Sequence, residues 1–140
     1  MRKLILISLS VFALFCLNNP VFAKDDKSTS KVVAYYFHGT FRCYSCNMIE
    51  KNTKEAIEEN FKKAIVSGRL EFKSVNVEAS GNGHFVKEYK LYSKAVVLVL
   101  IKDGKEVKSK NLTEIWQLLR NKKVFSEYIV KEVNGLLKEA

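Results

Sequence analysis

Two cysteines separated by two residues mark the point where a strand pattern gives way to a helix pattern. The motif runs Cys43-Tyr44-Ser45-Cys46, and Val32 to Phe37 before it is a run of β-branched, aromatic and small residues. Such a run is typical of a strand that is covered on both faces. From Cys46 onward, apolar residues recur at helical spacing. Because two intervening residues let the sulfurs meet within one helical turn, the motif predicts a sulfur pair where a helix begins.

Three further segments have strand patterns. We expect buried or half-buried strands over Leu70 to Val77 and over Ala95 to Ile101. Asp103-Gly104 is a two-residue hairpin signal, so the chain should return antiparallel as an edge strand at Val107. The apolar residues of Leu70 to Val77 change parity between Phe72 and Val75, which means that both faces are covered or that a bulge intervenes.

Helical spacing separates and follows these strands. The first helix should end at Ser67-Gly68, and a break near Asn121 should divide the last helical region. The expected helical segments are Cys46 to Ile65, His84 to Tyr92, Asn111 to Leu119 with Glu114 completing a capping arrangement at its start, and Phe125 to Leu137.

The resulting order of elements is βαβαββα. This order predicts an α/β domain with a mixed four-stranded sheet and helices on both faces. In such sheets, sites form at the carboxyl ends of strands, which is where the cysteine motif follows the first strand.

The first residues have the layout of an export signal. Arg2 and Lys3 precede an apolar run from Leu4 to Leu17, and Pro20-Val21-Phe22-Ala23 follows it. We therefore expect a signal peptide over 1–23 with cleavage after Ala23, a polar flexible linker over 24–30, and a single domain over 31–140. The alternative is an uncleaved signal that stays as a membrane anchor. Either way, the protein should be exported, to the periplasm or another extracytoplasmic location.

Cysteine usage and charge narrow the function classes. Cys16 leaves with the signal, so the mature chain keeps two cysteines in oxidising surroundings, where they form a disulfide or exchange with one. Without Arg2 and Lys3, 22 basic and 15 acidic residues leave a net charge of +7. The lysines are spread along the chain and no nucleic-acid motif accompanies them, so we expect no nucleic-acid partner.

The motif's position at a helix start suggests how the two sulfurs would differ. The first sulfur should lie at the helix N-terminus, where unpaired N–H groups and the helix dipole lower a thiol pKa below the free value of about 8.5. Cys43 should then attack a partner's disulfide, and Cys46, one turn deeper, should resolve the mixed disulfide. Arg42 either folds back to favour the thiolate or is simply solvated. His38 either assists proton transfer or only hydrogen-bonds its own loop.

These features resemble the thioredoxin family from Lys31 onward. The strand Val33 to Phe37, the motif, and Asn47-Met48-Ile49 after it are similar to the family's active-site strand, motif and helix. The run from Tyr35 to Cys43 is similar, more narrowly, to small exported bacterial proteins known as ArsF-type nitroreductase subunits. The resemblance implies a thiol–disulfide oxidoreductase or redox-partner subunit with no cofactor. Its partner would be a protein with a disulfide or dithiol, and the narrower resemblance implies a nitroreductase-type partner.

Two departures from the family limit what carries over. The family's cis-proline lies just before the strand that we expect over Ala95 to Ile101, and the position that corresponds here is Val96, while the chain's only proline is Pro20. Arg42 replaces the aromatic residue that precedes the first cysteine, and neither Tyr35 nor Tyr36 supplies the family's buried acid. The candidate supporting residues are Arg42, Tyr44, Ser45, His38 and Val96.

Other interpretations of the cysteines remain open. An inert structural disulfide is one, although a four-residue loop constrains the unfolded chain very little. Zinc bound with His38 or His84 matches no common spacing, whereas copper(I) suits paired thiolates and makes a copper-delivery protein the main alternative. We expect Trp116, Tyr35 and Tyr36 to lie in the core and His84 on the surface.

Overall fold

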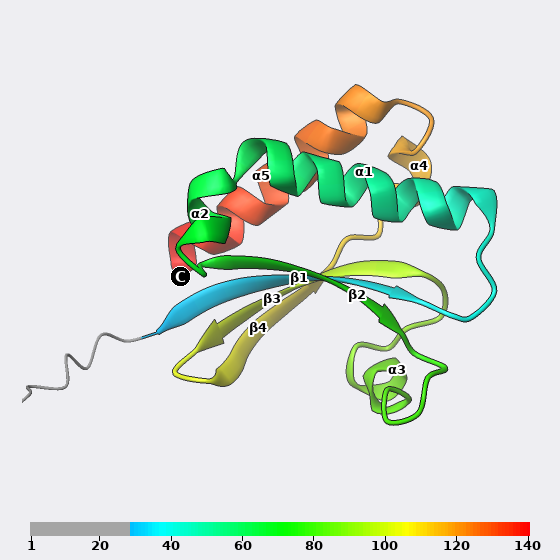
Figure 1. The fold of residues 1–140 in the computed structure, drawn as a ribbon, viewed down its shortest axis with the longest axis horizontal. Coiled ribbons are helices and arrows are strands. Elements are labelled where there is room, and N and C mark those ends of the chain that lie inside the picture. Colours follow the sequence, from blue (N-terminus) through cyan, green and yellow to red (C-terminus); the bar gives the residue numbers. More distant parts are fainter. Residues whose placement is uncertain (1–28) are drawn as a thin grey trace, which may run out of the picture.

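The computed structural model describes residues 29–140, and these form a four-stranded mixed sheet (Figure 1). The strand order is β2-β1-β3-β4. β1 runs parallel to β2 and antiparallel to β3, and β4 runs antiparallel to β3. The strands are β1 (Ser30–His38), β2 (Leu70–Asn76), β3 (Ala95–Lys102) and β4 (Lys105–Asn111). The predicted mixed sheet is confirmed.

Helices lie on both faces of this sheet, as the sequence predicted. α1 and α5 cover one face, while α3 covers one end of the other face (Figure 1). Together with the sheet they give the α/β class expected from the order βαβαββα, with α2 and α4 as short additions. Within residues 29–140, no helix is long and apolar enough to cross a membrane. The helices are α1 (Tyr44–Asn60), α2 (Lys62–Val66), α3 (His84–Glu88), α4 (Ile115–Leu118) and α5 (Lys122–Glu139).

The boundaries expected for the N-terminal part can be compared with the structure only at β1. β1 begins at Ser30, one residue inside the segment that we expected to be a linker. The signal peptide predicted over 1–23 and most of the linker over 24–30 lie outside the described residues.

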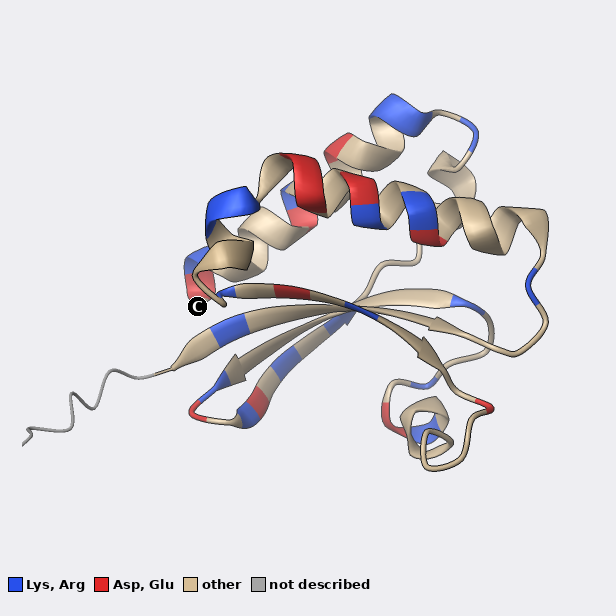
Figure 2. Ribbon diagram, viewed as in Figure 1, with Lys and Arg blue, Asp and Glu red and all other residues tan. Residues whose placement is uncertain are grey.

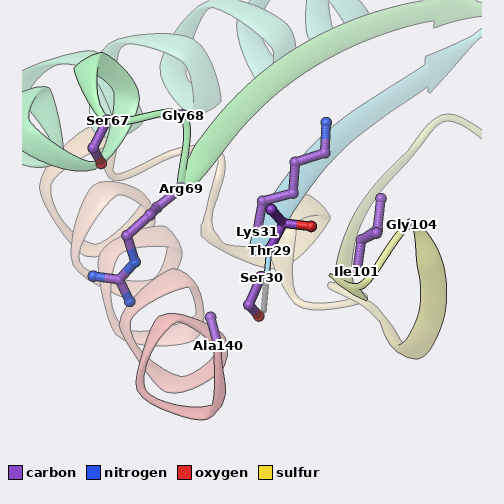
Figure 3. Close-up of a pocket in the computed structure, with 9 residues that line it drawn as sticks. All are labelled: Thr29, Ser30, Lys31, Ser67, Gly68, Arg69, Ile101, Gly104 and Ala140. Atoms are coloured by element: carbon purple, nitrogen blue, oxygen red, sulfur yellow. The ribbon is translucent and has the colours of Figure 1, made fainter. Parts of the chain in front are cut away.

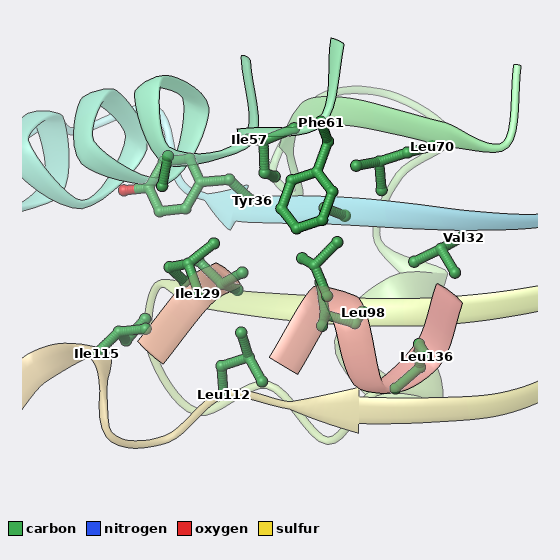
Figure 4. Close-up of a cluster of buried hydrophobic side chains, with 14 of the residues drawn as sticks. Val32, Tyr36, Ile57, Phe61, Leu70, Leu98, Leu112, Ile115, Ile129 and Leu136 are labelled. Atoms are coloured by element: carbon green, nitrogen blue, oxygen red, sulfur yellow. The ribbon is translucent and has the colours of Figure 1, made fainter. Parts of the chain in front are cut away.

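The main core lies between the sheet and the α1–α5 layer (Figure 4). Alternate β1 side chains, Val32, Ala34 and Tyr36, point into it, because successive residues of a strand face opposite sides. Leu98 of β3 and Ile129 of α5 are also fully buried there. This packing fixes α1 over the middle of the sheet and thereby fixes where its first turn begins.

A smaller apolar cluster lies on the opposite face, under α3. Phe37 and Val97 are nearly fully buried in this cluster, and Phe85 of α3 packs against them. The ring centroids of Phe37 and Phe85 are 5.2 Å apart. This cluster explains the parity change in β2: Phe72 packs on the main core and Val75 on the smaller cluster, with the register to β1 unbroken. The covered-on-both-faces interpretation is therefore correct.

The first helix is shorter than predicted. α1 ends at Asn60, and Phe61, with φ −125° and ψ 29°, leaves the helical conformation before α2 begins at Lys62. The Asn60 side-chain amide donates to the carbonyl of Ala56 at 2.8 Å and so competes for a backbone acceptor of the last turn. The Phe61 side chain still packs into the main core. The apolar spacing therefore continues across the break, and periodicity alone predicts one continuous helix.

The prediction that a helix starts at Asn111 is wrong. Asn111 is still part of β4 and pairs with Val97, and the chain turns helical only at Ile115. Glu114 occupies the position before α4 without a side-chain capping bond. The break near Asn121 is confirmed, since the Asn121 side chain caps α5 by accepting from the Val124 N–H at 3.2 Å.

Charged residues of both signs are spread over α1 and α5, and β4 carries three lysines and one glutamate (Figure 2). Two ion pairs, Lys108 with Glu139 and Lys110 with Glu132, connect β4 to α5. This distribution agrees with the expectation that the excess of lysine is spread over the chain.

A pair of substitutions tests where the stability of this fold resides. Leu98→Ala should lower the free energy of unfolding by about 2–5 kcal/mol, because Leu98 is fully buried between β3 and the helix layer. Val107→Ala on β4, where Val107 is 55% exposed, should stay within about 0.5 kcal/mol of the unsubstituted protein. Denaturant unfolding with the disulfide intact measures both. Equal losses would contradict the assignment of the core.

Candidate functional site

The cysteine motif lies at the junction of β1 and α1. Cys43 is the N-cap of α1, with extended backbone, and its sulfur accepts a hydrogen bond from the Cys46 N–H at 3.2 Å. The two cysteines form a disulfide, with their Cα atoms 5.0 Å apart. The structure thus brings the two sulfurs together at a helix start, where the strand–motif–helix pattern of the sequence expected them.

The two cysteines differ sharply in exposure. Cys46 is fully buried, whereas Cys43 is partly exposed. Phe41 and Tyr44 flank Cys43 in the chain and are 78% and 81% exposed. A molecule that approaches this end of the protein therefore meets the Cys43 side of the disulfide, beside two exposed aromatic rings.

The loop before Cys43 is held by residues at the end of β2, which sequence reasoning did not identify. The Glu78 carboxylate accepts from the Thr40 N–H at 2.8 Å, and the Asn76 amide donates to the Thr40 hydroxyl at 3.2 Å. A Cβ at Gly39 would lie 2.6 Å from a Glu78 oxygen, so glycine permits this close approach. The Thr40 hydrogen bonds hold the pKa of Glu78 below its usual value. The only available signal was that parallel strands end at the same edge of a sheet.

Tyr36 connects the first turn of α1 to the middle of the sheet. Its buried hydroxyl donates to the Cys46 carbonyl oxygen at 2.8 Å. Burial raises the pKa of Tyr36 to about 12, and the Glu50 carboxylate adds to this increase, although the Arg42 charge opposes it. Tyr36 therefore stays protonated and keeps donating across the physiological pH range. The prediction that Tyr36 is a core residue is confirmed, and its polar end also fixes the site.

Arg42 takes neither of the two positions that the sequence left open. Its guanidinium forms an ion pair with Glu50 of α1 and lies 5.7 Å from the centre of the Tyr36 ring. A second nitrogen of Arg42 lies 3.4 Å from Nε2 of His38. Nδ1 of His38 lies 2.8 Å from the Gly39 carbonyl oxygen, which can only accept, so Nδ1 carries the proton and Nε2 is free to accept from Arg42. His38 thus hydrogen-bonds within its loop.

Glu50 is another residue that the sequence did not single out. Burial raises the pKa of its carboxyl, but the Ser74 hydroxyl and the Arg42 guanidinium outweigh that effect, and the net pKa lies below the usual value. Glu50 follows Cys46 by four residues and so lies one helical turn further along α1. This spacing was visible in the sequence, but a glutamate on a helix with many charged residues carries no signal of its partner.

Val96 is the second residue of β3, which begins at Ala95 as predicted, so the position that corresponds to the family's cis-proline lies within the strand and not just before it. Val96 pairs with Tyr36 and is fully buried in the main core. No peptide bond within residues 29–140 is cis. Tyr44 and Ser45 form the first turn of α1 beside Cys43.

The predictions for Trp116, Tyr35 and His84 have different outcomes. Trp116 is 40% exposed, and its indole N–H donates to the Lys94 carbonyl at 3.3 Å, so the expectation of a core position is wrong. Tyr35 is partly buried against α3, 5.2 Å from the Phe37 ring centre. His84 is exposed, as predicted.

Within residues 29–140, no group of three or more histidine, cysteine and acidic side chains is gathered as metal ligands would be. Nδ1 of His84 lies 2.8 Å from the Gly81 carbonyl in the α3 region. His38 faces Gly39 and Arg42. Copper(I) binding by the reduced cysteines stays a prediction.

A hollow of about 700 Å³ lies at the other end of β1 (Figure 3). Thr29 and Lys31 line it where β1 begins, with Arg69 from the turn before β2 and Ala140 at the chain end. Because the cysteines follow the opposite end of β1, this hollow takes no part in sulfur chemistry.

Comparisons with known proteins yield distant structural likenesses. No protein-family model matches the chain, and no curated protein matches it. A structure described as that of a malarial protein is 16% identical, with a TM-score of 0.38, over 64% of this chain and 94% of that one. The thioredoxin of Fasciola hepatica is 22% identical, with a TM-score of 0.37, over 64% of this chain and 79% of that one. A Thermus thermophilus thioredoxin is 18% identical, with a TM-score of 0.37, over 69% and 76%. Likenesses this low carry no argument about activity.

Tyr36→Phe tests the connection between the sheet and α1. The substitution removes one buried hydroxyl but keeps the ring, so unfolding should become easier by about 0.5–1.5 kcal/mol. Hydrogen exchange of the α1 first-turn amides should speed up more than exchange in α5. Unchanged protection of the first turn would contradict the role given to this hydrogen bond.

The Glu50–Arg42 pair should make stability depend on pH with a definite sign. Because the folded pKa of Glu50 is depressed, its contribution is fully present above the unfolded value of about 4.3 and is lost as pH falls through the lower folded value. The difference in unfolding free energy between the unsubstituted protein and Glu50→Gln should therefore be constant from pH 7 to 5 and shrink below pH 4. A difference that grows on acidification would contradict this assignment.

Proposed function

We propose that the protein exchanges thiols and disulfides with a partner protein through the Cys43–Cys46 pair. The observation that carries this proposal is the asymmetric disulfide at the start of α1, in which Cys43 is partly exposed and Cys46 is fully buried. A bridge between residues three apart constrains the unfolded chain very little, so stabilising the fold is a poor reason for it.

The geometry supports a defined order of bond changes. In the reduced protein the Cys43 thiolate attacks a sulfur of the partner's disulfide, forms a mixed disulfide and releases one partner thiolate. Cys46 then loses its proton and attacks Cys43, which forms the intramolecular disulfide and releases the second partner thiolate. Two electrons pass to the partner, whose thiolates take up protons from solvent. The reverse sequence oxidises a partner dithiol.

The N-terminus of α1 supports the role of Cys43. The Cys46 N–H already points at the Cys43 sulfur, and the helix dipole places partial positive charge there. Both effects stabilise a thiolate relative to a thiol. Cys46 lacks this exposure, so it is suited to react only with the sulfur beside it.

The surroundings of the cysteine pair suit a protein partner better than a small-molecule partner. Phe41 before the motif and Tyr44 within it are both exposed, and exposed aromatic side chains are favoured at protein interfaces. Export to the periplasm or another extracytoplasmic location belongs to the proposal and is supported by Arg2, Lys3 and the apolar run 4–17. A nitroreductase-type partner stays a prediction from the resemblance of residues 35–43.

Trapping of a mixed disulfide tests the proposal. Reduced Cys46→Ala, offered a peptide disulfide, should form a stable adduct on Cys43, because the resolving thiol is absent. Alanine is used because serine would bury a hydroxyl at a fully buried position. Cys43→Ala is the matched control and should trap at least about tenfold more slowly, since its remaining thiol is buried. Both variants carry Cys16→Ala so that only the motif reacts.

The two variants also separate the outcomes. Adduct formation that is equally fast in both, or absent from both, would contradict the proposal. Adduct on Cys46→Ala together with catalytic reduction of insulin by the unsubstituted protein would favour a general reductase. The adduct without insulin reduction would favour a subunit dedicated to one partner.

A further inference from the structure

Arg42 precedes Cys43 directly, yet its charge is already engaged elsewhere. Its guanidinium pairs with Glu50, lies within hydrogen-bond distance of His38 and sits over the Tyr36 ring. Arg42 and Glu50 are each 27% exposed, so solvent screens this pair less than the exposed pairs of α1. The arrangement combines one cation, one carboxylate and two rings on the side of the motif where α1 meets the sheet.

Reduction of the disulfide changes the charge beside this group. The oxidised pair is neutral, whereas the reduced form carries a thiolate at Cys43 next to Arg42 in the chain. Two anions can then compete for Arg42: the Glu50 carboxylate, with which it pairs, and the sulfur of Cys43, the next residue in the chain. The choice between them alters the stability of the thiolate and hence the balance between the reduced and oxidised forms.

We propose that Glu50 is a positioning residue that holds Arg42 against Tyr36 and His38 and withholds its charge from the Cys43 sulfur. The Arg42–Glu50 pair then acts as a neutral unit, and the Cys43 thiolate depends on the N-terminus of α1 alone. This inference rests on the proposed exchange activity and adds the residues that set how readily the pair is reduced.

The anchoring of the pair supports this role. Tyr36 bonds to the Cys46 carbonyl and also lies under the guanidinium, so the surface that holds Arg42 is fixed to the same turn that holds the sulfurs. The His38 ring stacks near the Tyr36 ring, with centroids 5.7 Å apart. The other charged groups at this end are Glu78 after β2 and Lys94 before β3, which both line the hollow beside His38. They remain unchanged in the experiment below.

Glu50→Gln is the first test. Loss of the carboxylate frees Arg42 to approach the sulfur, so the pKa of Cys43 should fall and the thiolate fraction at a pH below that pKa should rise about threefold or more. At a pH above both the original and the lowered pKa of Cys43, the equilibrium with glutathione should shift toward the reduced protein by the factor by which the acid dissociation constant has risen, and a threefold rise makes the potential about 14 mV less negative. The pH profile of Cys43 alkylation and glutathione equilibration measure these two quantities in the Cys16→Ala background.

Three further variants distinguish positioning from charge alone. Glu50→Asp keeps the charge but shortens the side chain, so it should shift the Cys43 pKa in the same direction as Glu50→Gln. The double variant Arg42→Gln with Glu50→Gln removes both charges and should return to within about 1.5-fold of the unsubstituted thiolate fraction. Glu58→Gln, which makes the same charge change in the exposed Lys54–Glu58 pair of α1, should have no effect.

The contrary results are equally specific. If Glu50→Asp matches the unsubstituted protein while Glu50→Gln shifts, charge alone acts and Glu50 does not position Arg42. If the double variant loses thiolate, Arg42 acts directly on the sulfur and the inference is wrong. If stability falls in every Glu50 variant with no change in Cys43 pKa, the pair is merely structural. Each of these leaves thiol exchange intact, whereas failure of mixed-disulfide trapping defeats the proposed function itself.

Discussion

The hydrogen bond from Tyr36 to the Cys46 carbonyl is the contact on which the site depends. It joins the middle of the sheet to the cysteine motif, because Tyr36 belongs to a strand paired on both sides and Cys46 lies in the first turn of α1. Packing of α1 against α5 and the sheet sets the height of the helix, and this bond sets where its first turn sits. Since burial keeps the Tyr36 hydroxyl protonated, the connection does not weaken at neutral pH.

Two layers of contacts surround that connection. On one side, Asn76 and Glu78 at the end of β2 hold Thr40 and the loop that leads to Cys43. On the other, Arg42 folds onto Tyr36 and pairs with Glu50. The loop is therefore held at both ends while the Cys43 sulfur stays accessible. A rigid loop with one accessible sulfur suits exchange with another protein, because the reacting atom is presented without rearrangement of the backbone.

Sequence reasoning succeeded where a pattern repeats and failed where a single contact decides. Strand positions follow from runs such as Ala95 to Ile101, and the helix start follows from the motif, because periodicity over many residues reports burial. The end of α1 at Asn60 depends on one side-chain bond to Ala56, and the extension of β4 to Asn111 depends on pairing with Val97. Glu50, Asn76 and Glu78 were missed because polar residues on helices and strand ends have many uses, and only the fold shows which loop they meet.

The central claim is that Cys43 and Cys46 form a reversible redox pair rather than a fixed staple. Equilibration of the Cys16→Ala protein with glutathione buffers tests it most directly. We predict a two-electron reduction potential within the range of about −270 to −120 mV that is typical of exchanging pairs. A potential below about −300 mV, where structural disulfides lie, or the absence of a bond between the two sulfurs, would contradict the account.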